Sequence, residues 1–113
     1  QRFILLSSVF ALQPERWGEK FLADITDYNI AKYFADHWLV HNSGLNYTLL
    51  QPGALQETAA SGKIQINVAE PLPNAIGNVA ATLAALLNAP NTIGKVISMA
   101  DGSTPIATAL EAV

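Results

Sequence analysis

The sequence contains no cysteine, and only 13% of its 113 residues are charged. Without cysteine, the chain can form no disulfide framework, no thiolate zinc site and no cysteine nucleophile. A typical soluble domain is about one-quarter charged, so this chain carries little charge for its size. Half of the residues (50%) are hydrophobic, which at this length is enough to bury the core of one domain.

Basic residues and long apolar runs are also scarce. Six Lys and Arg stand against nine Asp and Glu, for a net charge of −3, so the basic surface typical of nucleic-acid binders is not expected. No apolar run approaches the roughly 18 residues of a membrane-spanning helix. The first residues show no signal-peptide pattern and no initiator Met, as in a piece of something larger. We therefore expect a cytoplasmic protein that binds neither nucleic acid nor a membrane.

Strand-like and helix-like segments alternate along the chain. Short runs of β-forming residues that end at turn residues predict strands over 3–6, 46–50, 64–68 and 95–99. Helical spacing predicts helices over 27–40, over 75–88 and from Pro105 onward, with Asp27 and Thr104 as N-caps. This alternation predicts an α/β fold with a mainly parallel sheet, formed by a single domain over 1–113.

Apolar positions predict which faces of these elements are buried. Ile30, Phe34 and Trp38 recur at i, i+4 and i+8 and predict an inward stripe on the first helix. The inward face predicted for the second helix consists of Ile76, Val79, Ala80, Leu83, Leu86 and Leu87. The first strand is continuously apolar, as in a strand that is buried on both faces, yet no strand precedes it in this sequence. Another half-domain or another copy of the chain would cover such a surface; the alternative is a small fold that closes on itself.

Three residue types suited to carbonyl chemistry fall at the start of the chain. Ser7 and Ser8 follow the first predicted strand, and Tyr28 and Lys32 are spaced i and i+4, so they share a helix face. A nearby ammonium favours the phenolate form of a tyrosine and so suits it to proton donation. A serine hydroxyl at the carboxyl end of a strand can hold a substrate oxygen at the edge where α/β sheets bind ligands. The alternative is that Tyr28 packs at the helix start and Lys32 is a solvated charge.

Other motifs predict less. His37 and His41 have the spacing of a helical zinc pair, but without a third ligand they are better interpreted as solvent-facing polar residues, and no metal site is expected. Asn46 begins a glycosylation sequon within a predicted buried strand, so we expect no modification there. Trp17 and Trp38 are expected to be core or interface residues rather than stacking platforms for a ligand.

The order of these motifs resembles the atypical short-chain dehydrogenase/reductase family, and within it the small NAD(P)-binding oxidoreductases related to sugar-nucleotide epimerases and NmrA-like proteins. The segments that carry the resemblance are Ser7-Ser8, 28–36, 43–53, 76–80 and 102–106. They span nearly the whole chain but correspond to the second, carboxy-terminal half of the family's fold. The resemblance implies a partial Rossmann-like fold, a doubly wound parallel sheet that lacks its first half.

The resemblance also implies roles for individual residues. Tyr28 would be the acid/base, Lys32 would hold the nicotinamide ribose and tune the tyrosine, and Ser8 would orient the substrate. Ser7 is the less favoured alternative to Ser8 in that role. The cofactor contacts implied are Ser7, Lys32, Pro52 and Gly53.

The sequence departs from the family pattern in three places. Gln51 stands where an Arg usually precedes Pro-Gly, and Asn78 stands where the family usually has an acidic residue. The glycine-rich loop that cradles the dinucleotide phosphates has no counterpart, because the seven glycines are never closer than eight residues. We therefore expect NAD or NADP binding to require the amino-terminal half, and the isolated chain to be inactive.

Two functions from different classes remain open. The first is the carboxy-terminal part of an NAD(P)-dependent oxidoreductase or epimerase-like enzyme that transfers hydride to or from a small carbonyl or alcohol at Ser8, Tyr28 and Lys32. The alternative is a non-catalytic NAD(P)-sensing or protein-interaction module, or an inactive fragment. The partners expected are a small-molecule substrate and either a second copy of the chain or the missing amino-terminal half.

Overall fold

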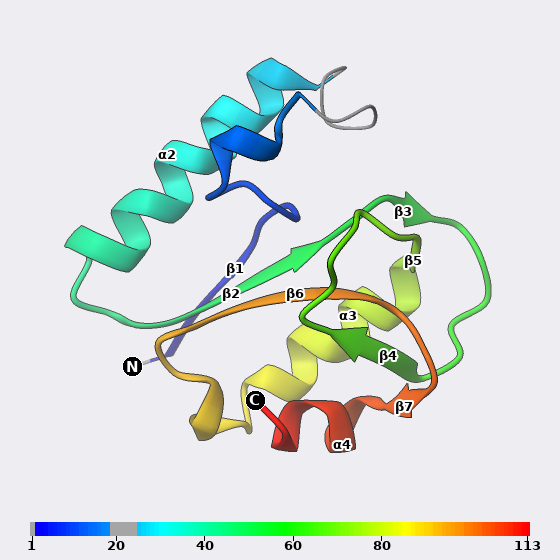
Figure 1. The fold of residues 1–113 in the computed structure, drawn as a ribbon. Helices are drawn as coiled ribbons and strands as arrows, with labels where there is room; N and C mark the ends of the chain where they lie inside the picture. Colours follow the sequence, from blue (N-terminus) through cyan, green and yellow to red (C-terminus); the bar gives the residue numbers. More distant parts are fainter. Residues whose placement is uncertain (1, 19–24) are drawn as a thin grey trace.

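A computed structural model of the chain describes residues 2–18 and 25–113. A main sheet of five strands, in the order β1-β2-β6-β4-β7, lies between α2 on one face and α3 and α4 on the other (Figure 1). Its strands are β1 (Arg2–Leu6), β2 (Asn46–Pro52), β4 (Lys63–Ile66), β6 (Lys95–Asp101) and β7 (Thr104–Pro105). The other elements are the strand pair β3 (Leu55–Gln56) and β5 (Asn74–Ala75), the helices α2 (Thr26–Asn42), α3 (Ile76–Leu86) and α4 (Ile106–Glu111), and the 3₁₀ turns η1 (Pro14–Arg16) and η2 (Pro90–Thr92).

The predicted α/β fold with a mainly parallel sheet is confirmed. β1, β2 and β6 run parallel, with Leu5 opposite Leu49 and Leu49 opposite Val96. The exception is β4, which pairs antiparallel with both β6 and β7. Because β1 and β2 run parallel in adjacent positions, their carboxyl ends lie at the same edge of the sheet.

The larger core lies between the sheet and α3 and α4. Its fully buried side chains include Leu50, Ile64, Leu86, Ile97 and Met99. The inward face predicted for α3 is correct at Val79 and Leu86 and wrong at Ile76, Ala80 and Leu87, which are exposed. These three lie on one flank of the helix, whereas Asn78 and Thr82 on the opposite flank are buried. Asn78 donates to Asp101 of β6, and the Thr82 hydroxyl donates to the Asn78 carbonyl of its own helix.

A smaller core lies on the other face of the sheet, under the chain that follows β1. Val9, Phe10, Val68 and Ala100 are buried together, and Ile25 packs against them. No strand or helix was predicted over residues 9–11, and the structure places them in buried turns. Phe10 takes a left-handed backbone conformation, with φ of 62°, that few non-glycine residues adopt.

The stripe predicted to bury α2 is wrong. Ile30, Phe34 and Trp38 are 40%, 67% and 56% exposed, whereas Asp36 and Leu39 are buried. The face of α2 that carries Lys32 and Asp36 turns toward the sheet, because both side chains form hydrogen bonds with groups at the ends of β1 and β2. Its N-cap is Ile25, so the predicted cap Asp27 lies in the first turn instead.

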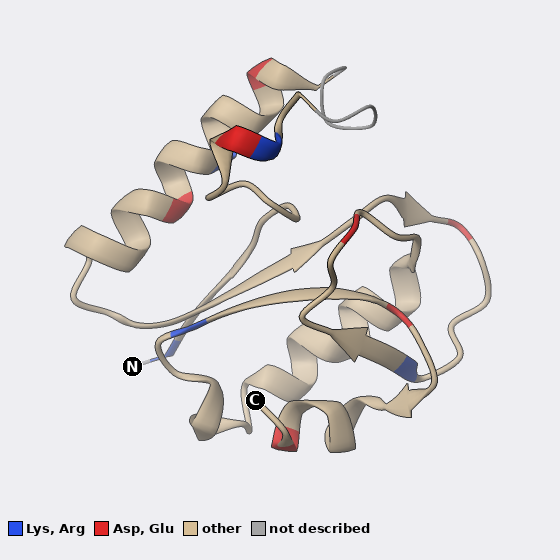
Figure 2. Ribbon diagram, in the orientation of Figure 1, with Lys and Arg blue, Asp and Glu red and all other residues tan. Residues whose placement is uncertain are grey.

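Two further expectations are corrected at the edges of the sheet. β1 pairs with β2 alone among the described strands, and Phe3 is 44% exposed, so β1 is not buried on both faces. The N-cap of α4 is Pro105 rather than Thr104, which pairs with Ile64 in the sheet. Charged residues are few and dispersed over the described elements (Figure 2), and none of the described helices is long and apolar enough to cross a membrane.

Candidate functional site

Six residues singled out by the sequence line a single cavity at the carboxyl ends of β1 and β2. The cavity has a volume of about 90 Å³. Its lining consists of Ser7, Ser8, Tyr28, Lys32, Pro52 and Gly53, together with Leu6 and Leu55. The structure thus brings together every residue that was predicted to contact substrate or cofactor, although they are separated by up to 46 positions in the sequence.

The parallel register of β1 and β2 explains why the serines meet the Pro-Gly turn. Leu6 lies opposite Leu50 at the end of β1. The backbone ladder continues past that point, because the Ser7 amide donates to the Leu50 carbonyl at 2.8 Å and the Val9 amide to the Pro52 carbonyl at 2.9 Å. Because this pairing continues to Pro52, Ser7-Ser8 lie directly beside Pro52-Gly53.

The first turns of α2 bring Tyr28 and Lys32 to the same cavity. The Lys32 ammonium lies 5.5 Å from the centre of the Tyr28 ring and donates to the Leu6 carbonyl at 3.2 Å. Lys32 is therefore anchored to the end of β1 rather than free in solvent. Tyr28 is 48% exposed and lines the cavity, so a molecule in the cavity can reach its side chain.

One functional-site neighbour was missed by the sequence analysis. Asp36 is fully buried one turn beyond Lys32, and its Oδ2 accepts a hydrogen bond from Ser7 Oγ at 2.5 Å. Burial raises the pKa of Asp36, while the bonds from Ser7 and Gln51 and the charge of Lys32 act in the opposite direction. The signal was present in the i, i+4, i+8 spacing of Tyr28, Lys32 and Asp36.

The two departures from the family pattern both form specific contacts. Gln51 donates from Nε2 to Asp36 Oδ2 at 3.1 Å. Asn78 accepts from the Gly62 amide at 2.9 Å and donates to Asp101 Oδ1 at 2.9 Å. An acidic residue at 78 would place a second carboxylate beside Asp101, whereas the Asn78 amide donates a hydrogen bond to the Asp101 carboxylate.

Gly53 is required by a close approach of backbone to backbone. A Cβ at this position would lie 2.4 Å from the Leu72 carbonyl oxygen and 3.0 Å from the Leu72 nitrogen. We expect Gly53→Ala to lower the free energy of unfolding by about 1–3 kcal/mol, because the turn beside the cavity must move. Urea denaturation measures the loss. Gly18→Ala is the control, since its Cβ would meet nothing within 4 Å; equal stability of the two variants would contradict the prediction.

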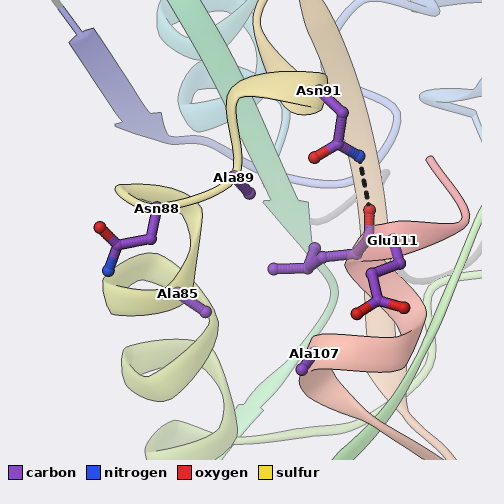
Figure 3. A pocket seen from close by; sticks show the side chains of 7 residues that line it. Ala85, Asn88, Ala89, Asn91, Ala107 and Glu111 are labelled. Carbon is purple, nitrogen blue, oxygen red and sulfur yellow. Dashed lines mark hydrogen bonds between the residues drawn. The ribbon is translucent and has the colours of Figure 1, made fainter.

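A larger cavity lies elsewhere and contains none of the predicted site residues. It measures about 340 Å³ between the end of α3 and α4 (Figure 3). Asn91 lines it and donates from Nδ2 to the Leu110 carbonyl at 2.9 Å. Glu111 is the one ionisable residue in its lining, so it offers no acid–base pair, and the smaller cavity is the better candidate site.

Other motifs of the sequence fall outside the candidate site. The His37 and His41 rings lie 4.5 Å apart, but the described residues include no group of three or more His, Asp or Glu that could hold a metal ion. Trp17 packs edge-on against Tyr33 at 5.9 Å and donates to the Phe10 carbonyl at 3.1 Å. It is a packing residue, as expected.

The chain matches known proteins over most of its length. The model of a family described as NAD(P)H-binding matches residues 1–90. The oxidoreductase ylbE from Lactococcus lactis superimposes with a TM-score of 0.97 at 49% sequence identity, over 100% of this chain and 52% of that one. ChuY, an anaerobilin reductase from Escherichia coli O157:H7, superimposes with a TM-score of 0.74 at 29% identity, over 89% of this chain and 50% of that one.

A curated relative is similar in sequence. The uncharacterized sugar epimerase YhfK of Bacillus subtilis is 33% identical over 114 aligned residues, which is 98% of this chain and 50% of YhfK. The chain therefore spans about half the length of the relatives that it matches. These similarities show that the chain forms part of a Rossmann-like fold of the kind found in oxidoreductases.

Proposed function

The chain belongs to the NAD(P)H-binding family, and we propose that it forms the carboxy-terminal part of an NAD(P)-dependent oxidoreductase or epimerase-like enzyme of the atypical short-chain dehydrogenase/reductase type. The observation that carries the proposal is the cavity at the ends of β1 and β2, where serine, tyrosine and lysine side chains converge. The reaction proposed is hydride transfer to or from a small carbonyl or alcohol.

The side chains of this cavity can supply the proton that carbonyl reduction needs. The reduced nicotinamide, when bound, supplies the hydride to the carbonyl carbon. Tyr28 donates its phenolic proton to the carbonyl oxygen, so the product is the alcohol, and the phenolate regains its proton from solvent. The nearby Lys32 ammonium stabilises that phenolate, and the Ser8 hydroxyl orients the substrate oxygen.

The residues fit the nicotinamide end of a dinucleotide and no more of it. Lys32 and the serines are donors suited to ribose and amide oxygens, and Pro52-Gly53 forms a wall without bulky side chains. The chain has no glycine-rich loop for the dinucleotide phosphates, because its seven glycines are never closer than eight residues. The phosphates and the adenosine must therefore be held by other parts of the protein.

We propose that an amino-terminal half completes the fold along the outer edge of β1. That edge has no partner among the described strands. Beside it lies an apolar groove of about 340 Å³, lined by Phe3, Leu5, Ala35, Trp38 and Leu39. A strand paired with β1 and a helix packed beside α2 would cover both, and the same half would supply the phosphate-binding loop. A second copy of the chain is the alternative occupant.

Reconstitution tests the proposed function. The part of the Lactococcus lactis ylbE protein that lies outside the match is fused ahead of this chain, and oxidation of NADH and NADPH is followed with a panel of small carbonyl compounds. We expect turnover with at least one carbonyl. Tight binding of the reduced cofactor without any turnover would instead favour a non-catalytic NAD(P)-sensing module.

A further inference from the structure

We infer that Asp36 is a positioning residue of the site: one of its carboxylate oxygens holds the Ser7 hydroxyl and the Gln51 amide, and so fixes the Ser7-Ser8 turn relative to Tyr28 and Lys32. The importance of this arrangement for catalysis rests on the proposed function. The contacts themselves do not, so they can be tested in the chain alone.

Asp36 joins three separate elements at a single atom. Its Oδ2 accepts Ser7 Oγ at 2.5 Å from the end of β1 and Gln51 Nε2 at 3.1 Å from β2. One turn earlier on α2, Lys32 donates to the carbonyl of Leu6, the residue before Ser7. The helix is therefore attached on both sides of the point where β1 ends, which is the point at which the candidate site begins.

The carboxyl group occupies an environment that does not favour its charge. Asp36 is fully buried, and its Oδ1 has no hydrogen-bond partner among the described residues. β1 and β2 contribute the neutral donors Ser7 and Gln51, and the nearest charge is Lys32 of the same helix. The other charged residue of these strands is Arg2, which is bonded to Leu86 and Thr92 at the far end of β1. Burial is accordingly the dominant effect and raises the pKa of Asp36.

Ionisation of Asp36 therefore has opposite effects on the stability of the fold and on the site. Because the pKa is raised, the stabilisation from the protonated form is complete below the ordinary Asp value of 3.8 and is lost as the pH rises through the raised value. The ionised Oδ2 accepts from Ser7 and Gln51 as a charged group, whereas protonation on the unpartnered Oδ1 leaves a neutral oxygen that accepts both bonds more weakly. The ionised form, which the fold disfavours, therefore holds the Ser7-Ser8 turn more tightly than the protonated form does.

Gln51 offers a sharp test of this coupling. It donates a neutral amide hydrogen to Asp36, where Gln51→Arg would offer a cation at a similar reach. The cation would stabilise the carboxylate, so the midpoint of the Asp36 titration is expected to fall. Ser7→Ala removes a bond that favours the ionised form, so the midpoint is expected to rise.

The experiment follows the ¹³C carboxyl signal of Asp36 and the backbone amides of Ser7 and Ser8 by NMR as a function of pH in the 113-residue chain. We expect the amides to shift with the same midpoint as Asp36, the midpoint to fall in Gln51→Arg and to rise in Ser7→Ala, and the shifts to be lost in Asp36→Asn. Glu57→Gln, at an exposed carboxylate, is expected to leave the midpoint unchanged.

Two results would overturn the inference. One is a set of Ser7 and Ser8 amide signals that stay constant while Asp36 titrates; the other is an unchanged midpoint in both Gln51→Arg and Ser7→Ala. Should Asp36→Asn fail to fold, the Ser7 and Ser8 amides still decide the matter, because positioning by Asp36 requires their shifts to follow the moved midpoint in Gln51→Arg. A reconstituted protein without turnover would remove the proposed function yet leave the NMR coupling intact, so the two failures are distinguishable.

Discussion

Tyr28→Phe is expected to lower the turnover of the reconstituted protein by about 10²–10⁴-fold, the usual contribution of a positioned general acid. The substitution removes the phenolic proton but keeps the ring, whose centre lies 5.5 Å from the Lys32 ammonium. Because Tyr28 is 48% exposed, its hydroxyl contributes little to the core, and the variant should fold normally. Steady-state oxidation of the reduced nicotinamide in the presence of a carbonyl measures the loss.

Tyr47→Phe is the matched control for this substitution. The Tyr47 hydroxyl donates to the Gly94 carbonyl at 3.2 Å, and the residue does not line the candidate site. Its removal should leave turnover essentially unchanged. Equal turnover for Tyr28→Phe and the unmodified protein would assign Tyr28 to packing at the start of α2 and would remove the catalytic role.

Leu50→Ala is expected to destabilise the fold by about 3 kcal/mol, within the range for large-to-small substitutions in a packed core. Leu50 of β2 is fully buried in the core that α3 and α4 form with the sheet. The same strand continues into Gln51 and Pro52. Since domains are stable by only about 5–15 kcal/mol, the loss should be visible as a large fall in the denaturation midpoint.

Leu87→Ala serves as the control for the core substitution, because Leu87 is 61% exposed just after α3. Chemical denaturation followed by circular dichroism should show a change of less than about 0.5 kcal/mol, as is usual for surface sites. Comparable losses in the two variants would mean that the described core does not determine the stability of the protein.

The structure brings the predicted site residues together, whereas it packs α2 differently from the prediction. Ser7, Ser8, Tyr28 and Lys32 were predicted from residue types at a strand end and from an i, i+4 spacing on a helix, whereas Pro52 and Gly53 were implied by the family resemblance. The structure brings all six to one cavity. Their chemical roles remain proposals.

The packing of α2 could not be predicted from the sequence in the same way. Periodicity favoured burial of Ile30, Phe34 and Trp38, yet the helix buries Asp36 instead. A periodic pattern shows that a face is apolar but not what it will meet. Here, hydrogen bonds to the ends of β1 and β2 turn the face with Lys32 and Asp36 toward the sheet. The apolar side chains of α2 therefore face away from the described sheet.

Residues 9–11 illustrate a second limit of sequence analysis. Val9, Phe10 and Ala11 are buried, although they lie outside every strand and helix predicted from the sequence. The burial depends on contacts with Val68 and Ala100, which lie almost sixty positions or more further along the chain. No local pattern in the sequence marks such a contact, and the left-handed conformation of Phe10 that it requires is one that local preference disfavours.

Cofactor binding tests most directly whether this chain supplies the proton-donor side of a nicotinamide site that a second half completes. Isothermal titration calorimetry would compare NADPH and NADH binding by the 113-residue chain alone with binding by the chain fused to the complementary part of the Lactococcus lactis ylbE protein. The account predicts no measurable binding by the isolated chain and micromolar binding by the fusion. Micromolar binding by the isolated chain, or none by a folded fusion, would contradict it.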